Sequence, residues 1–170
     1  MKPLFSTFLT LFYLSTATVY SMQTEYDDDV DDLPYVRIQY VSDFSQLAET
    51  ASAEEKIIML EVSASYCEYC DLLEEEFIKP MLRNDDYSAN VLIRKIDIDG
   101  YQTLIDFSGN KISSTVFSRH HNVKLTPTIL FFDGNGMEIT QRILGINSLE
   151  LYGGYIDDAL SKGLEKIRAQ

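Results

Sequence analysis

The apolar run Ile57-Ile58-Met59-Leu60, within residues 56–62, most constrains what this chain can fold into. A short continuous apolar segment is typical of a strand that is buried on both faces of a sheet. Residues 71–78 follow with apolar side chains at helical spacing, and residues 91–98 have the pattern of a second strand. This alternation predicts β and α units that build a sheet covered by helices.

The remaining segments extend the alternation. An edge strand is expected over residues 36–40 and a helix over 44–55, with Ser42 or Asp43 as its cap. Residues 100–110 are expected to be irregular. The later elements are a helix from Ser113 or Ser114 to His121, strands over 128–132 and 137–144 joined by the turn Asp133-Gly134-Asn135-Gly136, and a helix from Ser148 through Leu160. The predicted fold class is α/β, a mixed sheet flanked by helices, with no internal repeat and no second domain.

The helix expected over residues 71–78 has two contrasting faces. The apolar side chains Leu72, Leu73 and Phe77 should point inward, and Glu74, Glu75 and Glu76 should point mostly outward. Pro80 should end or kink this helix, because proline has no backbone N–H to donate.

The only two cysteines, Cys67 and Cys70, stand between the predicted buried strand and this helix. A fold stapled by disulfides would have several cysteines spread along the chain, so the pair indicates chemistry rather than scaffolding. The start of a helix supplies free backbone N–H groups and the positive end of the helix dipole, which stabilise a thiolate on Cys67. Cys70, one turn further on, is placed to attack a mixed disulfide formed on Cys67. The pair therefore predicts thiol–disulfide exchange.

Two other interpretations of the cysteine pair stay open. A zinc site needs four ligands, and the only other candidates are the adjacent residues His120 and His121, which do not easily face one metal. Alternatively, both cysteines are buried structural thiols, and their spacing at a helix start is a coincidence. We expect no metal and no organic cofactor.

The chain resembles the thioredoxin superfamily over roughly residues 57–160. The family's strand, turn and redox motif is matched by Glu61-Val62-Ser63-Ala64-Ser65-Tyr66-Cys67-Glu68-Tyr69-Cys70, with Tyr66 where tryptophan is usual. The family's central strand, its cis-proline strand and its last glycine are matched by Lys95-Ile96-Asp97-Ile98-Asp99, by Thr126-Pro127-Thr128 with the strand and turn that follow, and by Gly145. Within the superfamily, the chain looks most similar to exported bacterial thioredoxins of the sulfur-oxidation type, which share a longer tract like residues 106–111.

The resemblance implies a role for several residues besides the cysteines. Glu61 would be a buried acid with a raised pKa that accepts a proton from Cys70 through water, or else an exposed acid at a strand end. Pro127 would be cis, which would bring the Thr126 backbone beside the sulfur atoms to pair with an extended substrate segment. Tyr66 and Tyr69 would frame the substrate groove, or simply pack.

The same resemblance leaves two further assignments open. Lys95 matches a lysine near the buried acid, although a plain surface charge is the alternative. His120 and His121 are expected at the surface of a helix end, without a role in the site.

The N-terminal residues have the pattern of a targeting segment. Lys2 is followed by an uncharged, largely apolar run over residues 4–20, and Val19 and Ser21 fit a cleavage site. We therefore predict a signal peptide over residues 1–21, an acidic linker over 22–34, and a thioredoxin-like domain over 35–170. An uncleaved membrane anchor is the alternative, although a span needs about 20 mostly apolar residues. The predicted location is the periplasm.

The net charge of −13 narrows the class of partner. Nucleic acids and anionic lipids both need a basic surface, so neither is expected. The expected partners are exported proteins that carry disulfides and a membrane or soluble thiol reductant, with the chain itself acting as a monomer.

The direction of electron flow follows from charge near the cysteines. Glu68 and the acidic run over residues 74–76 should oppose a thiolate on Cys67, whereas strong oxidants stabilise that thiolate. We therefore expect a reductase or isomerase. A disulfide-forming oxidase with the same site and a non-catalytic binding module are the alternatives.

Overall fold

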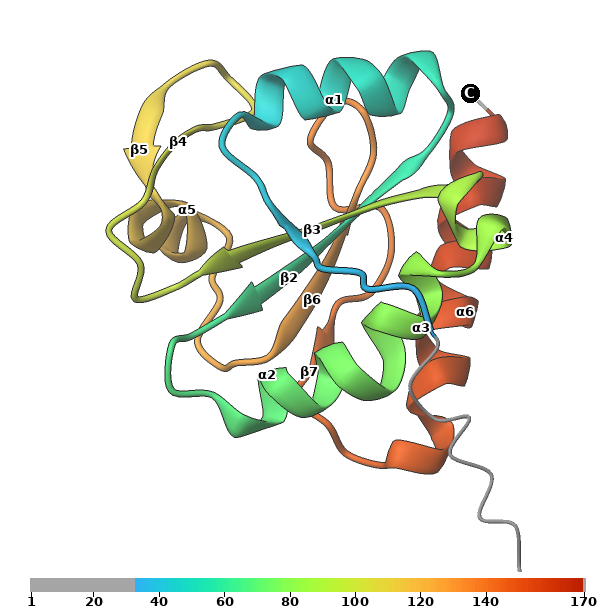
Figure 1. Cartoon of the computed structure of the whole chain (residues 1–170). Coiled ribbons are helices and arrows are strands. Elements are labelled where there is room, and N and C mark those ends of the chain that lie inside the picture. The colour runs from blue at the N-terminus through green and yellow to red at the C-terminus, as the bar shows by residue number, and fades with distance from the viewer. Residues whose placement is uncertain (1–32, 170) are drawn as a thin grey trace, which may run out of the picture. The chain divides into compact units, whose positions relative to one another are not determined.

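The computed structural model describes residues 33–169, and its centre is a five-stranded sheet (Figure 1). The spatial order of the strands is β1-β3-β2-β6-β7. Their bounds are β1 Gln39–Tyr40, β2 Ile57–Ser63, β3 Val91–Asp97, β6 Thr128–Phe132 and β7 Ile143–Leu144. β1, β3 and β2 pair in parallel, whereas β6 and β7 add antiparallel pairs. The predicted mixed sheet is confirmed.

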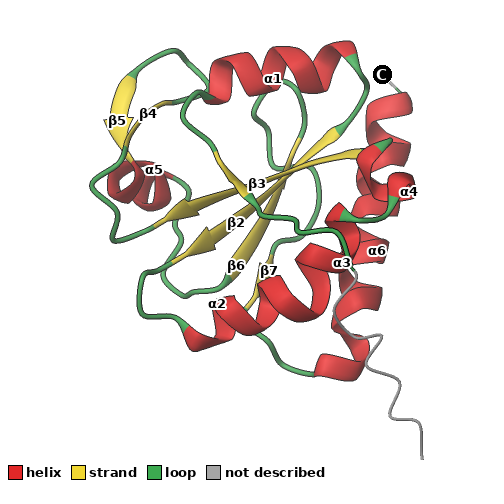
Figure 2. Ribbon diagram, viewed as in Figure 1, coloured by secondary structure: helices red, strands yellow, loops and turns green. Residues whose placement is uncertain are grey.

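Helices cover both faces of the sheet (Figure 2). One face carries α1 (Phe44–Ala53) and α5 (Ser114–His120). The other carries the helical segments α2 (Glu68–Leu73), η2 (Glu74–Ile78), α3 (Lys79–Leu82), α4 (Asp85–Ser88) and α6 (Leu149–Arg168). No helix within residues 33–169 is both long and apolar enough to cross a membrane.

β2 is the central strand, and all seven of its residues are buried. Side chains alternate between the two faces of a strand. Ile57 and Met59 accordingly pack under α2 and α6, while Ile58, Leu60 and Val62 pack under α1 and α5. The apolar run thus supplies both cores, as its composition predicted.

The helix after the cysteines differs from the prediction at both ends. It begins at Glu68, three residues earlier than expected, and η2 then has π-type hydrogen bonding, with the Lys79 N–H donating to the Glu74 carbonyl. The change of hydrogen-bond spacing comes directly before Pro80, which lacks an N–H and still lies inside α3. Pro80 therefore follows a local change of helix type and does not end the helix.

The region expected to be irregular, residues 100–110, contains one strand of a small second sheet. β4 (Thr103–Ile105) pairs with β5 (Lys111–Ser113). Asp106 stabilises the connection, because one of its carboxylate oxygens accepts from the backbone N–H groups of Ser108 at 2.9 Å and Asn110 at 2.8 Å. The turn at Gly109-Asn110 agrees with the sequence, whereas the pairing of β4 with β5 was not predicted.

The turn after β6 is confirmed, but the strand expected after it is not. The Asp133 carboxylate accepts from the N–H groups of Asn135 and Met137, each at 2.9 Å, and Gly136 has a φ of +74°. Between residues 137 and 144, pairing with β6 is limited to a bridge at Glu138 and to β7. The edge strand over 36–40 is likewise reduced to β1.

The cap predicted for the first helix is Asp43, whose side chain accepts from the Gln46 N–H at 3.0 Å. The predicted signal peptide, over residues 1–21, and most of the acidic linker lie outside the described residues.

Candidate active site

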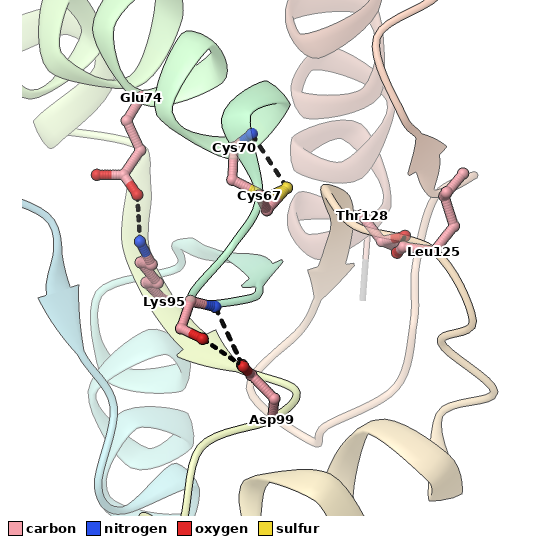
Figure 3. Close-up of a disulfide and its surroundings, with 8 residues drawn as sticks. Cys67, Cys70, Glu74, Lys95, Asp99, Leu125 and Thr128 are labelled. Atoms are coloured by element: carbon pink, nitrogen blue, oxygen red, sulfur yellow. Dashed lines mark hydrogen bonds and ion pairs between the residues drawn. A yellow bond between two sulfur atoms is a disulfide. The ribbon is translucent and has the colours of Figure 1, made fainter.

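Cys67 and Cys70 lie just beyond the carboxyl end of β2, joined by a disulfide (Figure 3). Cys67 is the N-cap of α2, and its Sγ accepts from the Cys70 N–H at 3.2 Å. Cys67 is partly exposed, whereas Cys70 is only 1% exposed. A partner molecule can therefore reach the sulfur of Cys67 but not that of Cys70.

Asp99, two residues after the end of β3, holds the loop that leads into Cys67. The Asp99 carboxylate accepts from the Ser65 N–H at 3.1 Å and from the Ser65 hydroxyl at 2.5 Å (Figure 3). The Cys67 N–H donates to the Ala64 carbonyl at 3.2 Å. These bonds fix the turn between β2 and α2.

Glu61 is fully buried in β2, so the alternative of an exposed acid at a strand end is wrong. Neither of its carboxylate oxygens has a hydrogen-bond partner among the described residues. Burial, and then the charge of Glu74, raise the pKa of Glu61 to about 8. A carboxyl group with that pKa can take up or release a proton near neutral pH.

Lys95 is the neighbour of Glu61 across the parallel pair of β2 and β3, but it forms its ion pair with Glu74 (Figure 3). Both side chains of this pair are largely buried. Burial lowers the pKa of Lys95, but the hydrogen bond to Glu74 and the nearby carboxylates outweigh that effect and raise it. Lys95 is therefore not a plain surface charge, and the expectation that Glu74 points outward is wrong.

Residues 124–127 lie beside the cysteine loop because of strand register. Thr128, the first residue of β6, is paired with Val62 near the end of β2, so the residues before Thr128 come next to the loop. The Thr126–Pro127 peptide bond is cis. The Thr128 hydroxyl donates to the Leu125 carbonyl at 2.6 Å, and the Gly145 N–H donates to the Pro127 carbonyl at 2.8 Å. Pro127 and Gly145, the two residues that the resemblance singled out here, are therefore joined by a backbone hydrogen bond.

The two tyrosines of the motif do not pack. Tyr66 is 79% exposed and Tyr69 is 62% exposed, on either side of Cys67 in the sequence. Their rings are free to contact a bound molecule.

The two histidines differ from each other. His120 is exposed, as expected. His121 is half-buried among Phe107, Phe117 and Phe132, and burial lowers its pKa, so its placement at the surface is wrong. In residues 33–169, no three His, Cys, Asp or Glu side chains are grouped to hold a metal ion.

The family model described as a thioredoxin-like domain matches residues 44–160. The chain belongs to the thioredoxin-like domain family. The solved structures that share its fold include two thioredoxins, each with a TM-score of 0.52. The thioredoxin of Malassezia sympodialis is 17% identical and the match covers 78% of this chain and 95% of that one. A poplar thioredoxin h mutant is 18% identical, and the match covers 79% of this chain and 92% of that one.

Curated relatives include proteins named thiol:disulfide interchange protein DsbD. The relative from Haemophilus ducreyi is 30% identical over 115 residues, which is 66% of this chain and 18% of the relative. The relative from Pseudoalteromonas atlantica is 26% identical over 124 residues, or 72% of this chain and 19% of the relative. The chain thus spans less than a fifth of the length of these relatives. The likeness to the sulfur-oxidation type finds no support in them and stays a prediction.

Proposed function

We propose that the protein is a thiol–disulfide oxidoreductase that reduces or isomerises disulfides of exported proteins through Cys67 and Cys70. The observation that carries the proposal is the arrangement of the pair. An accessible sulfur lies at a helix N-cap, a buried sulfur lies one turn along, and a buried acid lies in the strand beneath. A structural disulfide does not need an ionisable group at 0% exposure in the strand that leads into it.

The exchange begins from the dithiol form. The Cys67 thiolate attacks one sulfur of a substrate disulfide and forms a mixed disulfide, and the other substrate sulfur leaves as a thiolate that takes a proton from solvent. The Cys70 thiol then gives its proton, through a water molecule, to the Glu61 carboxylate and attacks the Cys67 sulfur. This releases the second substrate thiolate and leaves the Cys67–Cys70 disulfide. The substrate gains two electrons, and the protein loses two.

The surface around Cys67 suits an extended substrate segment. The backbone at Thr126 and Pro127 lies beside the cysteine loop and can pair with such a segment, and the exposed rings of Tyr66 and Tyr69 offer apolar contact area. These four residues form the proposed substrate-binding surface.

A thiol reductant, membrane-bound or soluble, must restore the dithiol after each cycle. The uncharged apolar run over residues 4–20 supports export, and we propose a periplasmic location. The likeness to proteins named thiol:disulfide interchange protein supports the same class of activity.

The test is reduction of insulin disulfides by the purified protein with dithiothreitol as the electron source. Cys67→Ser should abolish the acceleration over dithiothreitol alone, because no attacking thiolate is left. Cys70→Ser should accumulate a mixed disulfide with a small disulfide substrate, because nothing resolves it. A double Cys67→Ser, Cys70→Ser variant with wild-type activity would overturn the proposal.

A further inference from the structure

Tyr152 is a buried ionisable residue that the proposed exchange does not use. It lies on the inner face of α6 and is 1% exposed. It belongs to the core that contains Met59 and Ile129, and its ring lies 5.0 Å from that of Phe77. Its hydroxyl group has no hydrogen-bond partner among the described residues.

Glu61 faces the same core. In β2, residues 57, 59 and 61 share one face, and Ile57 and Met59 pack in the core that contains Tyr152. Both Glu61 and Tyr152 therefore place unpaired polar atoms between the sheet and α6. A buried polar group without a partner costs free energy, so each of the two needs the other or a shared water.

Two unpaired hydroxyl groups are candidates to donate to Glu61, that of Ser63, two residues along β2, and that of Tyr152. Four charged groups act on the pKa of Glu61, namely Asp71 of α2, Glu74 of η2, and Lys95 and Asp97 of β3. Three of these are carboxylates, which repel a charged Glu61. Lys95 directs its ammonium group to Glu74 and makes no hydrogen bond to Glu61. Glu61 in turn acts on the pKa of Tyr152 of α6. Of the groups that act on Glu61 or respond to its charge, Tyr152 alone has an uncommitted O–H to donate.

We propose that the Tyr152 hydroxyl donates a hydrogen bond to the Glu61 carboxylate, through one bridging water or a small side-chain movement, whenever Glu61 gives up its proton. Tyr152 is then a positioning residue, because it acts through Glu61 and touches no substrate. The inference rests on the proposed function, in which Glu61 takes the proton of Cys70. Burial and the charge of Glu61 raise the pKa of Tyr152, so its hydroxyl keeps its proton while Glu61 titrates.

The test compares Tyr152→Phe with wild-type protein by titrating the Glu61 carboxyl ¹³C resonance in the oxidised form. Loss of the donor should raise the titration midpoint by about one pH unit, a tenfold change in proton affinity. The matched control is Tyr155→Phe, the same change on the same helix at an exposed position, which should leave the midpoint unchanged. A midpoint in Tyr152→Phe equal to that of wild type would overturn the inference.

A second measurement uses wild-type protein and avoids any folding defect of the variant. The Tyr152 ¹³Cζ resonance should shift with the same midpoint as Glu61, and a resonance that stays constant across that range would contradict the hydrogen bond. Neither titration requires exchange activity. Wild-type protein that fails to reduce insulin would therefore overturn the proposed function, whereas normal reduction with an unchanged Tyr152→Phe midpoint would overturn only the role of Tyr152.

Discussion

Glu61 combines full burial with an ionisable carboxyl group, and the cost of that combination depends on pH. Below about pH 4.5 the carboxyl is protonated in both the folded and the unfolded chain. Between 4.5 and about 8 the unfolded chain loses this proton while the folded chain keeps it, so rising pH favours unfolding. Above about 8 both states are ionised, and the loss of stability is complete.

Glu61→Gln should remove this pH dependence, because glutamine stays neutral. The variant should gain stability over wild type as pH rises from 5 to 9, with an upper bound of roughly 5 kcal/mol at about 1.4 kcal/mol per pKa unit. Urea unfolding at pH 5, 7 and 9 measures the difference. Parallel stability curves for the two proteins would contradict the raised pKa.

Glu74→Gln tests whether Glu74 keeps Lys95 from Glu61. Removing the Glu74 charge and freeing Lys95 both favour ionised Glu61, so its titration midpoint should fall by about one pH unit. Glu76→Gln is the matched control, since Glu76 is exposed on the same helical segment. A midpoint that rises, or that moves equally in both variants, would contradict the assigned pairing.

At the scale of elements, the turn after β6 fits closely against α1. A Cβ at Gly134 would lie 2.8 Å from the backbone nitrogen of Ser52, so even alanine forces a backbone shift. Gly134→Ala should lower the free energy of unfolding by about 1–3 kcal/mol.

The control for this contact is Gly154→Ala in α6, where an added Cβ meets no atom within 4 Å. There the gain in helix propensity should stabilise the protein by about 0.5–1 kcal/mol. Thermal or urea unfolding of both variants measures the pair. Stability changes of the same sign would contradict the close approach of the turn to α1.

The elements that the sequence predicted well are those with strong local patterns. The apolar runs at residues 57–60 and 129–132 became central strands, and the cysteine pair lies at a helix start, although that helix begins three residues earlier than predicted. The β4–β5 pair was missed, and β7 is shorter than the strand predicted over residues 137–144, because strand pairing depends on distant partners rather than on local composition.

In the candidate site too, residues with a local sequence pattern were predicted, and residues that depend on contacts with distant parts of the chain were not. Its cysteines and Glu61 have fixed spacings in the sequence, so a resemblance could point to them. Asp99, Glu74 and Tyr152 were not predicted as parts of the site. Asp99 meets Ser65 across 34 positions, Glu74 meets Lys95 across 21, and Tyr152 reaches the core only when α6 packs on the sheet. Such contacts exist only in the folded chain.

For the molecule as a whole, the proposed direction of electron flow depends on the acidic side chains around Cys67. Glu74 is neutralised by Lys95, so it opposes a Cys67 thiolate less than the sequence suggested. Glu68 and Asp71 remain exposed in the first turn of α2, where their charges still disfavour the thiolate. The acidic surface is thus compatible with a reducing or isomerising pair rather than a strongly oxidising one.

The reduction potential of the Cys67–Cys70 pair tests this account most directly. The purified protein would be equilibrated in glutathione or dithiothreitol buffers, and the fraction of dithiol measured at each potential. A reducing or isomerising pair should show a reversible two-electron titration at about −180 mV or below, near the values of protein disulfide isomerase and thioredoxin. A midpoint near about −120 mV, or no reversible titration, would contradict it.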